Sequence, residues 1–66
     1  MRASINGEEY ELPEGTTVAQ VLVQMQALER GIAVAKNDRV VRRAAFEEER
    51  ISEGDRIEII RAVAGG

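Results

Sequence analysis

The chain has 66 residues, which is enough for one domain at most, and 44% of them are hydrophobic, close to the usual fraction in a globular domain. It contains no cysteine and no histidine, and its net charge is −3. This composition excludes disulfides and catalysis by a cysteine nucleophile or a histidine base, and it disfavours zinc sites and nucleic-acid binding. The sequence shows no membrane-spanning run and no signal peptide, so we expect a cytoplasmic protein with no membrane partner.

Residues 1–12 have the pattern of a β-hairpin. Apolar and polar side chains alternate over residues 1–5 and again over 9–12, which is the period of a strand. Asn6-Gly7 lies between the two runs, and this dipeptide suits a type I′ turn because both central residues need a positive φ. Pro13-Glu14-Gly15 predicts a turn after the hairpin.

The next segment predicts a helix over residues 18–30. Thr17 is a suitable N-cap, and Gln20, three residues later, completes a capping box. Gly31 is the expected left-handed stop, with Arg30 favourable at the negative end of the helix dipole. The apolar residues recur at helical spacing, which predicts a stripe facing the core, made by Val18, Val21, Leu22, Met25 and Leu28.

Two short strands follow the helix. Residues 32–36 are almost continuously apolar, as in a strand buried on both faces, and residues 39–42 form the second strand. Asn37-Asp38 is the turn between them, although it lacks a glycine. Residues 44–46 predict one helical turn that places Phe46, the only phenylalanine, in the core.

The last predicted strand covers residues 56–63, after a turn at Glu53-Gly54-Asp55. Its alternation fails at Ile60, which should lie on the face opposite Ile59. A bulge or burial on the second face of the sheet is the favoured explanation. The alternative is that Ile60 belongs to an exposed partner surface.

The element order is two strands, a helix and three strands. This order predicts an α+β domain with a mixed four- to five-stranded sheet, one crossover helix packed on one face, and the last strand beside the first. That arrangement is the ubiquitin-like, or β-grasp, fold. We place the domain at residues 1–63 and a flexible tail at residues 64–66.

The tail carries the strongest functional signal. Two terminal glycines occur by chance in only about 0.5% of chains, and here Gly65 and Gly66 follow the last strand of a β-grasp pattern. A carboxylate becomes electrophilic once it is adenylated, and glycine, which has no Cβ, allows an activating enzyme to enclose the terminus closely. The tail could also be an inert, frayed end.

Over its full length, the sequence resembles the ThiS family of sulfur carriers. In this family a proline commonly follows the Val-Val pair, and here Arg42 stands in that place, which leaves the local path of residues 42–46 open. The resemblance rests on Asn6-Gly7, Gly15-Thr16-Thr17-Val18, Leu22, Leu28, Ala35-Lys36-Asn37, Val40-Val41, Phe46, Gly54-Asp55-Arg56-Ile57 and Val63-Ala64-Gly65-Gly66.

The resemblance implies a mechanism in which the chain is a carrier and not an enzyme. A ThiF-like enzyme would adenylate Gly66 with ATP, a persulfide donor would supply sulfur, and the resulting thiocarboxylate would serve thiazole synthase. The carrier itself would bind no cofactor, because ATP is used by the activating partner. Gly65, Ala64 and Val63 would line the partner's channel, and Ile60 could join the docking surface.

Three other readings stay open at this point. A small subunit of molybdopterin synthase, similar to MoaD, shares the fold and the Gly-Gly end but is usually longer. A ubiquitin-like modifier would join Gly66 to lysines in isopeptide bonds. A plain binding module would not need the two terminal glycines.

Overall fold

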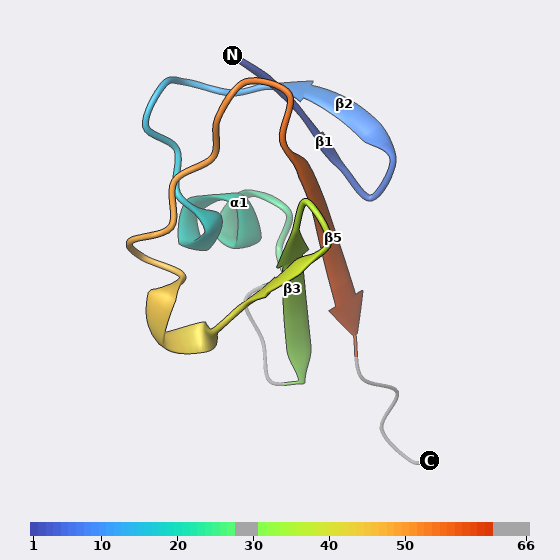
Figure 1. Cartoon of the computed structure of the whole chain (residues 1–66), viewed down its shortest axis with the longest axis vertical. Helices are drawn as coiled ribbons and strands as arrows, with labels where there is room; N and C mark the ends of the chain where they lie inside the picture. The colour runs from blue at the N-terminus through green and yellow to red at the C-terminus, as the bar shows by residue number, and fades with distance from the viewer. Residues whose placement is uncertain (28–30, 62–66) are drawn as a thin grey trace.

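The computed structural model describes residues 1–27 and 31–61, which form a twisted sheet with a single α-helix (Figure 1). Each strand predicted from the sequence is present, and so is the helical turn that precedes Phe46. In chain order the elements are β1 (Arg2–Ile5), β2 (Glu8–Glu11), α1 (Val18–Gln24), β3 (Ile32–Lys36), β4 (Arg39–Val41), the short 3₁₀ helix η1 (Arg43–Ala45) and β5 (Arg56–Arg61).

The sheet has five strands in the order β2-β1-β5-β3-β4. β1 runs parallel to β5, while β3 is antiparallel to both β5 and β4. The expectation that the last strand lies beside the first is therefore confirmed, and β5 is the middle strand of the sheet. The mixed sheet and its single helix have the predicted β-grasp architecture.

The hydrophobic core lies between α1 and one face of the sheet. Ile5, Leu22 and Ile57 are its largest fully buried side chains, and Phe46 joins them at 5% exposure, as predicted. Burial of a large apolar side chain contributes roughly 1.5–3 kcal/mol, so these residues supply much of the stability of a small domain. The rest of the core is made by Ala3, Leu12, Val18, Val21, Ala27, Ile32, Val34, Val41 and Ile51.

The helix begins as predicted but ends earlier. Thr17 and Gln20 form the expected capping box, yet α1 stops at Gln24 instead of residue 30. Gln26 adopts a left-handed φ of 57°, and the Ala27 and Gln26 amides donate to the carbonyls of Leu22 and Val23 at 2.8 and 3.0 Å. These two bonds form a Schellman motif, which ends the helix six residues early.

The residue at the left-handed position of this motif is a glutamine. The prediction relied on a glycine, Gly31, to end the helix and therefore placed the helix end too late. Gly31 does have a positive φ of 78°, but it stands directly before β3 and not at the helix end. Leu28 and Arg30, which the prediction also used, lie outside the described residues.

β3 is not buried on both faces as predicted. Val34 is buried against the helix side, but Ala33 on the opposite face is exposed. On that outer face Ala35 is buried at 9% exposure, so the face is open at Ala33 and closed at Ala35, and within residues 1–27 and 31–61 no helix packs on it. β4 ends at Val41, one residue earlier than predicted.

Arg42 takes the place of the family's usual proline without changing the path of the chain. Its φ of −70° and ψ of 145° are values that proline itself adopts. The chain therefore turns from β4 into η1 in a proline-compatible conformation, and Phe46 reaches the core.

Both tight turns place an asparagine at a left-handed φ, 51° for Asn6 and 52° for Asn37. Each asparagine also binds β5 through its side chain. The Oδ1 atom of Asn6 accepts from the Ile59 amide at 2.8 Å, and that of Asn37 accepts from the Arg56 amide at 2.9 Å. These are the two asparagine clamps, and they hold β5 near both of its ends.

The side chain of Asn37 also binds a buried carboxylate. The Nδ2 atom of Asn37 donates to Asp55 Oδ1 at 2.9 Å, and the Ser52 amide donates to Asp55 Oδ2 at 2.7 Å. Asp55 is only 9% exposed, so its carboxylate has lost most of its contact with water. The two hydrogen bonds compensate for that lost hydration.

The Schellman motif predicts that Gln26→Gly stabilises the fold. Glycine adopts the left-handed conformation without the steric cost of a side chain, so the free energy of unfolding should rise by about 0.5–1 kcal/mol. Gln24→Gly, inside α1, is the matched control and should lower it by a similar amount. Urea titration of both variants checks the opposite signs, and destabilisation by Gln26→Gly would contradict this account.

The asparagine clamps predict that Asn37→Gly destabilises the fold, even though glycine suits the backbone at that position. The loss of two side-chain hydrogen bonds, one to the buried Asp55, should cost about 1–3 kcal/mol in thermal or urea unfolding. Asp38→Gly in the same turn removes only an exposed ion pair with Arg56 and should change stability by less than about 0.5 kcal/mol. Equal effects of the two changes would show that the clamp contributes little.

Candidate functional site

The predicted site begins where β5 ends. Val63, Ala64, Gly65 and Gly66 lie outside the described residues, so the structure defines the platform from which they continue. The last residue of β5, Arg61, is paired with Ile32 of β3. On the other side, β1 pairs with the start of β5, and the Asn6 clamp extends this contact to Ile59. The strand that leads to the tail is thus held from both sides.

Ile60 lies on the outer face of the sheet, the face away from α1. Its pairing with Ala33 belongs to a regular antiparallel register that runs from Ile57 to Arg61, so the favoured prediction of a bulge is wrong. Burial on the second face is wrong too, because Ile60 is 54% exposed. A regular strand must point residue 60 outward once residues 57 and 59 point into the core.

Ile60 is part of an apolar strip that crosses the outer face. Val40 of β4 is 78% exposed, and it pairs with Ala35, which lies two residues from Ala33 on the same face of β3. We call this set the outer strip: the exposed side chains of Ala33, Val40 and Ile60, with the buried Ala35 between them. It reaches from the tail-bearing strand to the edge of the sheet.

Sequence reasoning singled out Ile60 but missed the rest of the outer strip. The signal was present, because β3 is apolar at successive positions, and this pattern was interpreted as burial on both faces. An apolar residue on each face of a strand indicates burial only if a second layer exists. The part of the chain that the structure describes has one α-helix, which packs on the opposite face, and no second layer of these residues covers the outer face.

A recess of about 420 Å³ lies beside the end of β5, lined by Asn6, Met25, Ala27, Ile59 and Arg61. Met25 and Ile59 are only partly buried there. Met25 belongs to the turn after α1 and Asn6 to the first hairpin turn. The recess therefore joins the helix end, the hairpin turn and the strand that leads to the tail.

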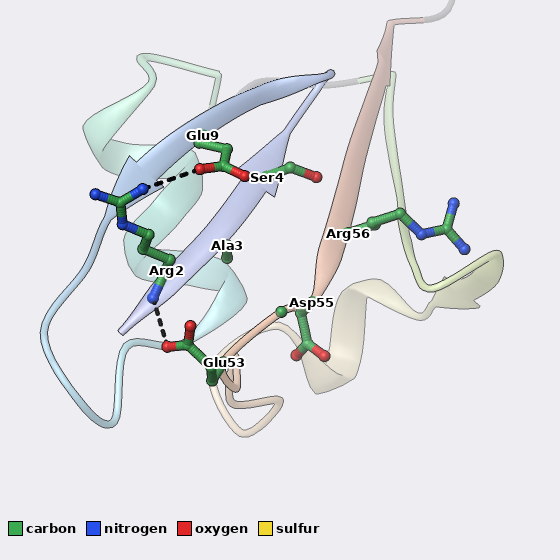
Figure 2. Close-up of a pocket in the computed structure, with 8 residues that line it drawn as sticks. Arg2, Ala3, Ser4, Glu9, Glu53, Asp55 and Arg56 are labelled. Carbon is green, nitrogen blue, oxygen red and sulfur yellow. Dashed lines mark hydrogen bonds and ion pairs between the residues drawn. The ribbon is translucent and has the colours of Figure 1, made fainter.

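A second hollow, of about 460 Å³, lies over the start of β5 and is polar (Figure 2). Its charged groups are satisfied within the chain. Arg2 Nη1 binds Glu9 at 3.2 Å, the Arg2 amide donates to Glu53 at 2.8 Å, and Asp55 is held by Asn37 and Ser52. This arrangement stabilises the domain and leaves no poised acid–base pair.

The titratable groups of the described residues give the same picture. The hydrogen bond from its hydroxyl to Glu8 raises the pKa of Tyr10, and the bond to Asp38 raises the pKa of Arg56. Both groups are exposed and neither lies at the end of β5. Across residues 1–27 and 31–61, no three histidine, cysteine or acidic side chains cluster as metal ligands would.

The α-helix of the described residues is short. Among the described segments, no helix has both the length and the apolar character needed to cross a bilayer.

Solved structures with the same fold are available for comparison. A crystal structure of the thiamine biosynthesis protein ThiS from Geobacter metallireducens superposes with a TM-score of 0.84 and 25% identity, and the match covers 100% of both chains. SAMP1 from Haloferax volcanii matches at a TM-score of 0.65 with 17% identity, over 98% of this chain and 97% of its own, which shows a shared fold.

Two curated relatives match the whole chain in sequence. The sulfur carrier protein ThiS of Escherichia coli is 29% identical over 66 residues, which is 100% of both proteins. The thiazole synthase of Paramagnetospirillum magneticum is 30% identical over the same length, but the chain spans only 20% of that protein. The model of the ThiS family matches residues 3–66, from the first strand to the terminal glycine, and the chain therefore belongs to the ThiS family.

Proposed function

We propose that this chain is a sulfur carrier of thiamine biosynthesis and that the Gly66 carboxylate is its carrier group. The observation that carries the proposal is the family match, which continues through Gly65 and Gly66 to the end of the chain. The full-length similarity to the Escherichia coli sulfur carrier protein supports it. The fold adds a physical reason, since the tail continues from a strand that is fixed in the middle of the sheet.

In this proposal a ThiF-like enzyme first activates the tail. A Gly66 carboxylate oxygen attacks the α-phosphate of ATP, pyrophosphate leaves, and an acyl-adenylate forms. The terminal sulfur of a partner's persulfide then attacks the acyl carbon, and the carbon–oxygen bond to AMP breaks, which leaves Gly66 joined to the partner through a sulfur–sulfur bond. A thiol attacks the partner's sulfur in that bond, so that a disulfide forms on the partner side and the Gly66 thiocarboxylate is released. The carrier supplies the reacting carboxylate and no catalytic side chain, so it is a substrate of the activating enzyme.

The acceptor of the sulfur is thiazole synthase in this proposal. The thiazole synthase of Paramagnetospirillum magneticum contains a stretch similar to the whole of this chain within a protein about five times as long. Joining two modules in one chain raises their effective concentration, which is useful when one delivers a group to the other. The same pairing between separate chains is what we propose here.

The outer strip is the surface at which we expect partners to bind the domain. Ile60 and Ala33 lie beside the end of β5, so a partner that encloses the tail can cover them in the same encounter. Exposed apolar groups of this kind gain free energy when a partner removes them from water. The tail residues Val63 and Ala64 would continue that contact into the partner's channel.

The carrier role predicts a mass change at the C-terminus. After incubation with ATP, a sulfide source and a ThiF-like enzyme, the intact chain should gain the mass difference between sulfur and oxygen. A chain shortened to Gly65 should show no gain, and Gly66→Ala should fold normally but react more slowly because its Cβ crowds the reacting carbonyl. If an enzyme that is active on a known carrier gives no gain, the sulfur-carrier proposal fails. Isopeptide-linked products would then favour a protein modifier.

The docking role predicts that Ile60→Glu weakens binding to the activating enzyme by about tenfold or more, as loss of an apolar anchor in an interface does. The thermal stability should change little, because Ile60 is 54% exposed. Val23→Glu on α1 is the matched control, since Val23 is 61% exposed on the other side of the domain. Calorimetric titration measures both, and equal affinities would rule out the outer strip as the docking surface.

A further inference from the structure

The chain has very few groups that could attack its own activated terminus. Eight of its nine basic residues are arginines, whose guanidinium stays protonated and is not a nucleophile, and Lys36 is the single lysine. With no cysteine, and no histidine to activate a hydroxyl, the amino groups of Lys36 and Met1 are the remaining candidates. In the structure, both amino groups contact oxygen atoms of the same chain.

Lys36 lies at the end of β3, and its amino group points to oxygen atoms of the loop before β5. The Nζ atom is 2.5 Å from Glu49 Oε2, 3.1 Å from the Arg50 carbonyl oxygen and 3.9 Å from Asp55 Oδ2. Its side chain is 22% exposed, because it lies along the domain surface instead of extending into water. An ammonium has three hydrogens to donate, and three oxygens surround this one.

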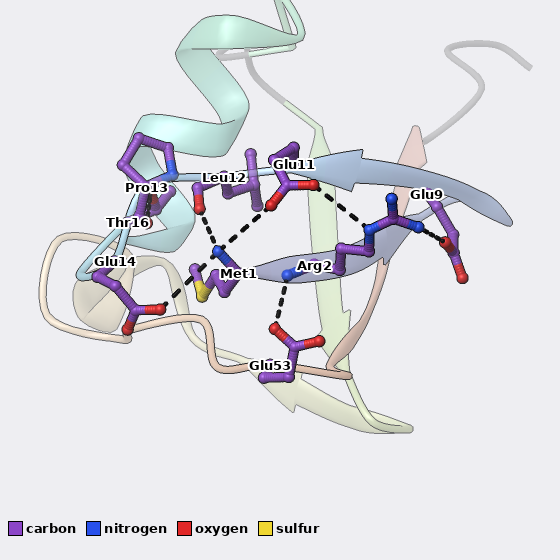
Figure 3. Close-up of polar contacts among 9 residues, drawn as sticks. All are labelled: Met1, Arg2, Glu9, Glu11, Leu12, Pro13, Glu14, Thr16 and Glu53. Carbon is purple, nitrogen blue, oxygen red and sulfur yellow. Dashed lines mark hydrogen bonds and ion pairs between the residues drawn. The ribbon is translucent and has the colours of Figure 1, made fainter.

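The amino group of Met1 lies beside Leu12, Glu11 and Glu14 (Figure 3). It donates to the Leu12 carbonyl at 2.9 Å and lies 3.8 Å from the carboxylates of both Glu11 and Glu14. This bond continues the ladder of the first hairpin, in which the Leu12 amide donates back to the Met1 carbonyl at 2.8 Å. The amino group is thus part of the sheet.

We propose that these ion pairs keep the carrier from acylating itself, so that only an external sulfur nucleophile captures the activated Gly66. The inference rests on the proposed function. An amine attacks an acyl-adenylate through its lone pair: a carbon–nitrogen bond forms, the carbon–oxygen bond to AMP breaks, and the amine releases a proton to solvent. An amino group whose hydrogens are bound to carboxylate and carbonyl oxygens of its own domain has no free approach to the acyl carbon.

These ion pairs would distinguish a sulfur carrier from a protein modifier, because the two differ in whether amino groups on the protein surface should react with the activated C-terminus. A modifier is meant to react with amines, so lysines on its surface are tolerated or used. A carrier whose product is a thiocarboxylate loses material to every accessible amine. The pair formed by Lys36 and Glu49 is therefore a specificity determinant that acts far from the tail, since Lys36 pairs with Ile57 near the start of β5.

The test uses the chain prepared with a thioester at Gly66, which needs no activating enzyme. Self-acylation then forms a carbon–nitrogen bond and expels the thiolate, giving a covalent dimer or a cyclised chain that intact mass resolves from hydrolysis. Glu49→Ala removes the nearest partner of Lys36 and should form these products up to about fivefold faster than the parent chain, the change expected for loss of a partly exposed ion pair. Glu47→Ala, an exposed neighbour with the same charge change, should match the parent.

Two further variants keep the test decisive if Glu49→Ala perturbs folding. Arg39→Lys adds an exposed amine at a position that makes no ion pair within the described residues, and it should also accelerate self-acylation. Glu49→Ala combined with Lys36→Arg should return to the parent rate. A parent chain that acylates itself as fast as Arg39→Lys would overturn the proposal. A failure of adenylation by ATP would instead overturn the proposed function, which the thioester reaction does not test.

Discussion

The structure depends on how β5 is held in the middle of the sheet. It is the last strand of the described residues and yet has neighbours on both sides, β1 in parallel and β3 in antiparallel orientation. The parallel contact with β1 covers only two residue pairs, so the Asn6 side chain extends it by binding the Ile59 amide. The Asn37 side chain does the same at Arg56. Two turns that reverse the chain locally thus also fix a strand that is distant in sequence.

The alternation of β5 connects this constraint to function. Ile57 points into the core and is 1% exposed, so Ile60, three residues later, must lie on the opposite face. The strand therefore presents an apolar side chain to solvent just before the tail continues. Because the core fixes the strand's register, the outer strip has a fixed position on the strand that leads to the tail, which is what the proposed docking requires. A tail that continued from a frayed edge strand would have no such reference surface.

Local signals in the sequence predicted local structure well. Asn6-Gly7 fixed the first turn, and Thr17 with Gln20 fixed the helix start, because in each case the residues interact with their own neighbours. The helix end was mispredicted because Gln26 takes a left-handed conformation that glutamine rarely favours on its own. The exposure of Ile60 was only the less favoured prediction and that of Ala33 was missed, because exposure depends on which face receives the helix, and that is decided by the packing of distant elements. The two asparagine clamps join residues 19 and 53 positions apart, so no local pattern could show them.

A carrier of activated acyl groups faces opposite demands at its two ends. Its tail must react readily, whereas the body must offer nothing that reacts with the tail. In the proposed function, the lack of cysteine and histidine would meet the second demand, and the contacts of the two amino groups with carboxylates and carbonyls would complete it. The ion pairs that hold them are modest as sources of stability, because surface pairs of this kind contribute about 0–1 kcal/mol. Their value is chemical: an amine engaged in such a pair is a poor nucleophile even where its contribution to folding is small.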